Sequence, residues 1–139
     1  MSYNNLEIFN EEELFNTLED YQKEIINEIG YSEKDSEEIA EIWLNASTSN
    51  TVAFGTRTGK KIFYENIKKE VIRFICDENS YVNERQKLFS KSDITHAFFI
   101  NILTTAIAPV VGTSATFLTP VIVLFLISVG NVTKNAFCL

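Results

Sequence analysis

The sequence predicts an all-α fold, a compact bundle of five or six helices with a central apolar helical hairpin at about 94–130. Two observations predict it. Apolar residues recur at three- and four-residue steps along most of the chain, which is the spacing of a helix face. From Ile94 to Thr133 there is no Asp, Glu, Lys or Arg, so this segment is expected at the centre of the bundle. At 139 residues, the chain 1–139 is expected to form a single helical domain.

An acidic helical pair is expected in residues 1–46. An apolar stripe over residues 14–29 predicts a first helix from about Glu11 to Ile29. A second helix is expected from about Glu33 to Ala46, with Ser32 as its N-cap.

Mildly basic helices are expected in residues 60–89. One runs from about Lys60 to Asp77, and a short one follows from about Tyr81 to Phe89. Residues 47–59 break the periodic pattern and predict a loop, with a short extended piece at 52–54.

The apolar hairpin is expected to have two arms. The first should end near Ala108, before Pro109, and the second should run from about Ala115 to Val129 with Pro120 kinking it or shifting its start. Each arm of roughly 15–17 residues spans about 22–26 Å, slightly less than a bilayer core of about 30 Å. Burial inside a soluble bundle is therefore favoured, and membrane contact through 94–130 stays open as the alternative.

Pore-forming colicin domains resemble this arrangement, because they also hide an uncharged helical hairpin inside amphipathic helices. The resemblance is one of layout, with no shared motif, and it implies a membrane-active protein as the alternative function.

The charge is unevenly placed along the chain. The net charge is -7, and residues 1–50 hold thirteen acids and two lysines. So acidic a chain is a poor candidate for direct nucleic-acid binding, which depends on neutralising phosphates. The cluster Glu37, Glu38 and Glu41 is a candidate docking surface for a basic partner, and a merely solvated face is the alternative. Trp43 is a candidate interface anchor, although a tryptophan on such a stripe is more often part of the core.

No constellation of catalytic residues is apparent, so we expect no catalytic, cofactor-binding or metal-binding residues and no enzyme. The segment from Gly55 to Lys61 fails the spacing of a phosphate-binding loop. Arg85 and His96 are too far apart in sequence for the compact Arg–His spacing of HEPN-type ribonucleases. A pH-sensitive trigger for the hairpin is the functional hypothesis for His96, and a helix-terminal hydrogen bond to Asp93 is the structural one.

The first residues, MSYNNLEIFN, have neither a basic start nor an apolar run, so no signal peptide is expected. This predicts a cytoplasmic protein, with Cys76 and Cys138 as free thiols. The preferred function is a non-enzymatic protein–protein interaction module, a small accessory subunit that docks on a larger partner or self-assembles as a homo-oligomer. Accessory proteins of bacterial conflict systems have this general appearance.

Overall fold

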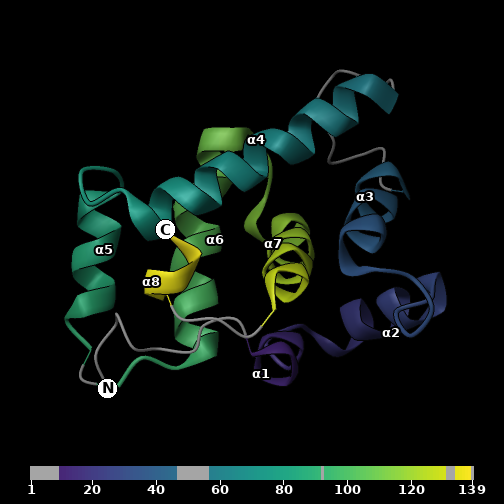
Figure 1. Ribbon diagram of the computed structural model, residues 1–139, viewed down its shortest axis with the longest axis horizontal. Coiled ribbons are helices and arrows are strands. Elements are labelled where there is room, and N and C mark those ends of the chain that lie inside the picture. Colours follow the sequence, from purple (N-terminus) through teal and green to yellow (C-terminus); the bar gives the residue numbers. More distant parts are fainter. Residues whose placement is uncertain (1–9, 47–56, 92, 131–133, 139) are drawn as a thin grey trace.

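The computed structural model describes residues 10–46, 57–91, 93–130 and 134–138, and these residues form helices and turns with no strand among them. The predicted all-α fold is confirmed. Figure 1 shows one helix, α7, nearly end-on in the middle of the molecule, with the others arranged around it. The helices in chain order are α1 (Glu11–Phe15), α2 (Asp20–Ile29), α3 (Ser36–Ala46), α4 (Arg57–Cys76), α5 (Val82–Phe89), α6 (His96–Val111), α7 (Ala115–Val129) and α8 (Lys134–Phe137).

Helix α7 forms the centre of the hydrophobic core. Between Phe117 and Ile127, every residue except Thr119 is buried. This helix is apolar on all sides, so it needs partners on all sides. Helices α1, α3, α4 and α6 supply them, while α5 packs on the far side of α6 (Figure 1). The uncharged segment therefore lies at the centre, as its composition predicts.

The acidic helical pair is three helices rather than two. The predicted helix from Glu11 to Ile29 is wrong, because the chain breaks between Phe15 and Asp20. Gln22 accounts for part of the break: its Oε1 accepts a hydrogen bond from the Glu19 N–H (2.9 Å) and so caps the start of α2. The next helix begins at Ser36, three residues later than predicted.

The start of α3 is set by Asp35 rather than by Ser32. Asp35 Oδ1 accepts hydrogen bonds from the backbone N–H groups of Glu37 (2.9 Å) and Glu38 (3.2 Å), which satisfies two donors of the first turn. In the mildly basic part, α4 begins at Arg57, inside the segment predicted as a loop. The extended piece expected at 52–54 lies outside the described residues.

Both prolines of the apolar pair lie inside helices. Helix α6 continues past Pro109 to Val111, because a proline so near the end removes one hydrogen bond, to the carbonyl of Thr105 on the exposed side. In α7 the consequence is larger, since Pro120 is buried and leaves the carbonyl of Thr116 without its helical donor. Gln22 Nε2 donates to that carbonyl at 3.1 Å from α2.

The connection between α6 and α7 depends on Gly112, which ends α6 with a φ of 85°. This left-handed conformation carries little penalty in glycine and is unfavourable for other residues. The chain bends by 113° between the two helices, so the predicted hairpin is an open one rather than an antiparallel pair. Its two arms cross steeply, which lets α3 and α4 also reach α7.

Cys76 and Cys138 form a disulfide, so the prediction of free thiols is wrong. The bond joins the last residue of α4 to the residue after α8, and the Cα atoms lie 5.6 Å apart. Helix α8 is a single turn that the sequence analysis did not predict. The bond fixes the C-terminal segment beside the last turn of α4. At this end α4 lies next to α5 and α6 (Figure 1).

Arg85 is buried and caps a helix. Its side chain is 6% exposed, and its Nη1 donates to the carbonyl of Phe74 in the last turn of α4. The C-terminal carbonyls of a helix carry a partial negative charge, so a guanidinium there is favourable. Arg85 thus joins α5 to α4, which is a structural role.

Candidate functional site

Glu37 joins α3 to α4. Its Oε2 accepts hydrogen bonds from the Tyr64 hydroxyl (2.9 Å) and from the Lys68 ammonium (3.1 Å). Burial, followed by the hydrogen bond to Glu37, raises the pKa of Tyr64 far above its ordinary value of 10.0. Glu37 is one of the predicted docking residues, and its carboxylate is therefore engaged in contacts within the molecule.

Trp43 also makes an internal contact. Its indole Nε1 donates to the carbonyl of Phe117 (3.1 Å), and the two ring centroids are 6.2 Å apart. The Phe117 carbonyl is next to the one that Pro120 leaves without a donor, so Trp43 and Gln22 bond adjacent carbonyls of α7. The side chain is nevertheless only partly buried, and its use as an interface anchor stays a prediction.

Glu38 and Glu41 remain at the surface of α3. Glu38 is exposed and Glu41 is half-buried. The structure therefore places these two carboxylates and Glu37 on one helix, within two turns of each other. Binding of a partner by this cluster stays a prediction.

His96 is the first residue of α6 and lies against α1. Its side chain is 15% exposed, and its Nδ1 is 3.9 Å from Oε2 of Glu13. The expected partner, Asp93, is exposed. Sequence spacing could not reveal Glu13 as a neighbour, because only the fold brings these two distant helices together. A trigger role for His96 stays a prediction.

An aromatic hollow that the sequence analysis missed lies at the end of α1. The rings of Phe15 and Tyr31 stack with centroids 4.8 Å apart, and Glu11, Glu12 and Asn16 complete a shallow depression of about 330 Å³. The Tyr31 hydroxyl donates to Oε2 of Glu11 (2.6 Å). Burial and this hydrogen bond raise the pKa of Tyr31 above its ordinary value of 10.0, so the hydroxyl keeps its proton. Aromatic rings beside carboxylates favour a cation.

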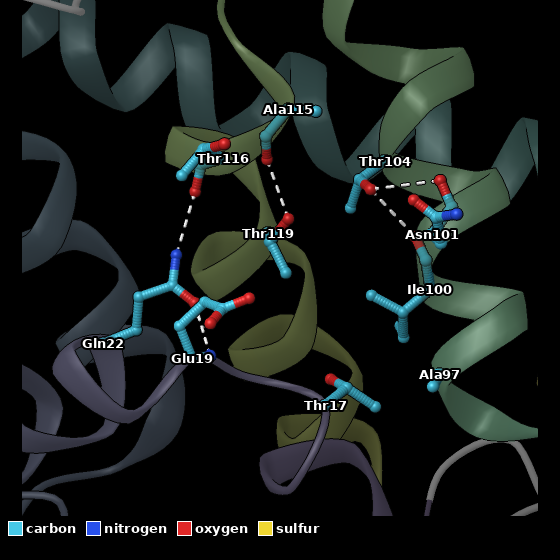
Figure 2. Close-up of a pocket in the computed structure, with 10 residues that line it drawn as sticks. All are labelled: Thr17, Glu19, Gln22, Ala97, Ile100, Asn101, Thr104, Ala115, Thr116 and Thr119. Atoms are coloured by element: carbon cyan, nitrogen blue, oxygen red, sulfur yellow. Dashed lines mark hydrogen bonds between the residues drawn. The ribbon is translucent and has the colours of Figure 1, made fainter.

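A polar cleft of about 220 Å³ lies between the α1–α2 connection, α6 and the first turns of α7 (Figure 2). Threonines dominate its walls, and Glu19, Gln22 and Asn101 add a carboxylate and two amides. Gln22 is 2% exposed, although sequence periodicity gave no sign that a glutamine on an acidic helix would be buried. The sequence feature that indicates this burial is Pro120, because the carbonyl that a proline leaves without its helical donor needs a substitute donor.

The titratable side chains of the cleft are limited to Glu19, so the described walls hold no base paired with a nucleophile. Within the described ranges, no three His, Cys, Asp or Glu side chains gather in a way that could hold a metal ion. The cleft is thus a place for binding through hydrogen bonds and one negative charge.

No family model matches the chain, and neither a curated protein nor a solved structure matches it. Among the described residues, no single helix is both long and apolar enough to cross a membrane. Helices α6 and α7 reach that length and composition only together, as a pair bent by 113°.

Proposed function

We propose that the protein is a non-enzymatic interaction module that docks on a basic protein partner through the outer side of α1, α2 and α3. These three helices lie together on one side of α7 (Figure 1). These helices and the turn between α2 and α3 carry an acidic surface of exposed and half-buried carboxylates, namely Glu11, Glu12, Asp20, Glu24, Glu28, Glu33, Glu38 and Glu41.

Apolar side chains exposed within this acidic surface carry the proposal. Tyr21 and Ile25 lie one turn apart on α2 and are 50% and 39% exposed, with Glu24 and Glu28 beside them. An apolar centre with a charged rim is the usual composition of a transient protein interface.

The aromatic hollow of Phe15 and Tyr31 supports a basic partner in particular. A lysine or arginine side chain in the hollow would contact a ring face and the Glu11 and Glu12 carboxylates. Such an anchor gives the acidic surface a specific contact in addition to its long-range attraction.

The experiment compares two triple charge reversals of equal net charge. Glu24→Lys, Glu28→Lys and Glu38→Lys together change the acidic surface. Glu78→Lys, Glu84→Lys and Asp93→Lys change the opposite part of the molecule and serve as the control. The probe is a synthetic amphipathic peptide rich in Arg and Leu, and its Kd is measured by fluorescence anisotropy at two salt concentrations.

The acidic-surface variant should raise Kd by about tenfold or more, and the control by much less. Both effects should shrink as salt screens the charges, since the screening length is about 8 Å at physiological ionic strength. Equal weakening by the two variants would mean that the peptide responds to net charge alone and that the proposed surface is not a docking site.

Self-assembly is the second form of this proposal, because the homo-oligomer would use the same exposed pair, Tyr21 and Ile25. Light scattering of wild type and of Tyr21→Lys separates the two forms. A dimer mass that falls to the monomer mass in the variant favours self-assembly. A cytoplasmic setting stays a prediction, and the Cys76–Cys138 disulfide weighs against it because such bonds persist mainly in oxidising compartments.

A membrane-active protein is the alternative, favoured by the uncharged α6–α7 pair. Val123 is fully buried, so a single added cysteine there tests it, with Cys76 and Cys138 left paired in their disulfide. An environment-sensitive dye on Val123→Cys should shift to the blue with anionic liposomes if α7 inserts, and more so at pH 5. Resistance of that cysteine to thiol reagents, with no response to liposomes, would remove the membrane alternative.

A further inference from the structure

The polar cleft between α6, α7 and the α1–α2 connection offers hydrogen-bond acceptors. Three of its threonine hydroxyls donate their only hydrogen to a carbonyl nearby in their own chain segment. These bonds are Thr17 to Leu14 (2.6 Å), Thr104 to Ile100 (2.9 Å) and Thr119 to Ala115 (2.7 Å). A hydroxyl that has donated keeps its lone pairs, so the oxygens of Thr17 and Thr119 remain available only as acceptors, whereas Thr104 is 2% exposed and too buried to meet a ligand.

The cleft is also negatively charged. Figure 2 shows the Glu19 carboxylate directed toward the middle of the cleft, with Thr119 above it and Thr17 below. Among the described residues that line it, none is a lysine or an arginine. Gln22 is already bonded at both ends of its amide, to the Glu19 N–H and to the Thr116 carbonyl, so it holds the wall in place.

We propose that this cleft binds a primary ammonium group, carried by a small aliphatic amine. An ammonium has three N–H donors and no acceptor, which complements two threonine oxygens and the Glu19 carboxylate. The volume of about 220 Å³ is below the roughly 300 Å³ at which drug-sized pockets begin, so it suits a short amine. This site goes beyond the proposed protein docking and uses different residues.

The test is a titration of the wild-type protein with n-butylammonium chloride, followed by ¹⁵N–¹H correlation spectra. Saturable shifts should appear at the amides of Thr17, Gln22, Thr104 and Thr116, with a Kd on the order of 1 mM for a few hydrogen bonds and one partly solvated charge. Two probes separate charge from hydrogen bonding. n-Butanol has the shape without the charge, and tetramethylammonium has the charge without N–H donors.

Matched variants then locate the site. Glu19→Gln should raise the Kd by about fivefold or more, while Glu24→Gln, the same change on the exposed side of α2, should leave it within about twofold. Thr119→Val removes one acceptor and should weaken binding, and Thr119→Ser should restore it. Unchanged spectra away from the cleft show that each variant keeps the fold.

Three results would overturn the proposal. Glu24→Gln could weaken binding as much as Glu19→Gln, which would show general attraction to an acidic protein. Tetramethylammonium or n-butanol could bind as tightly as n-butylammonium, which would show that the threonine oxygens take no part. Shifts could also be absent from the cleft amides altogether. None of these results bears on the basic-peptide experiment, which tests the acidic surface.

Discussion

Gln22 should stabilise the fold through Pro120, a residue of another helix. Its Nε2 donates to the Thr116 carbonyl, the carbonyl whose helical donor is missing at Pro120. Gln22→Met keeps the length of this buried side chain and removes both its donor and its acceptor. The change leaves a part-buried carbonyl without its donor, which costs about 1–2 kcal/mol, and loses the bond from the Glu19 N–H, worth about 1 kcal/mol.

A double-mutant cycle with Pro120→Ala separates these two contributions. Alanine restores the N–H that can bond to the Thr116 carbonyl within α7, so the Gln22 donor becomes redundant. In that background Gln22→Met should cost only the Glu19 contact, about 1 kcal/mol. The expected coupling energy between Gln22 and Pro120 is therefore about 1–2 kcal/mol, above the usual additivity error of about 0.5 kcal/mol.

Urea unfolding of the four proteins, followed by far-ultraviolet circular dichroism, measures the cycle. With an unfolding entropy of about 0.3 kcal/mol/K for this chain length, a loss of about 2–3 kcal/mol also lowers Tm by about 7–10 °C. Gln86→Met is the matched control, because Gln86 is exposed on α5 and its loss should stay within about 0.5 kcal/mol. If Gln22→Met costs the same in the wild-type and in the Pro120→Ala background, the substitute-donor argument is wrong.

Other predictions concern the core, the disulfide and pH. Leu124→Ala, at a fully buried position of α7, should lower the free energy of unfolding by about 2–5 kcal/mol, whereas Val110→Ala, at a position 57% exposed, should change it by about 0.5 kcal/mol or less in urea melts. Changing Cys76 and Cys138 to Ser opens a loop with a sequence separation of 62 and should cost about 4 kcal/mol in the chain-entropy estimate; equal melts with and without reductant would contradict the bond. Stability should fall above about pH 10, because the raised pKa of Tyr64 means that the folded state retains a proton that the unfolded state releases. Tyr64→Phe should make this fall less steep by up to about 1.4 kcal/mol per pH unit, and parallel pH curves of variant and wild type would refute it.

Composition predicts the centre of this fold better than it predicts the ends of its helices. The uncharged run that becomes α7 could find enough apolar partners only in the interior, so its place follows from burial alone. The break between α1 and α2 could not be read from periodicity, because Leu14, Leu18 and Ile26 are all buried and keep one apolar stripe across it. The Glu19–Gln22 cap was the local signal for that break.

The candidate sites were harder to predict because they are made by contacts between distant segments. The charge pattern indicated an acidic surface, yet it could not show that the Glu37 carboxylate would accept hydrogen bonds from Tyr64 and Lys68. The aromatic hollow forms only because the chain turns back after α2 and places Tyr31 beside Phe15. The disulfide requires the chain end to reach α4, and two cysteines at that separation carry no spacing rule.

The disulfide also changes how the protein would respond to a mechanical load. If the two chain ends are pulled apart, tension passes through α4 and crosses directly to Cys138, so the intervening chain carries no force. About 60 residues, on the order of 200 Å of contour length, stay out of the extension. Helix α7 lies within this segment. Pulling therefore detaches α1, α2 and α3, while no force acts along α7. Adding a reductant would release the missing length as a further extension step.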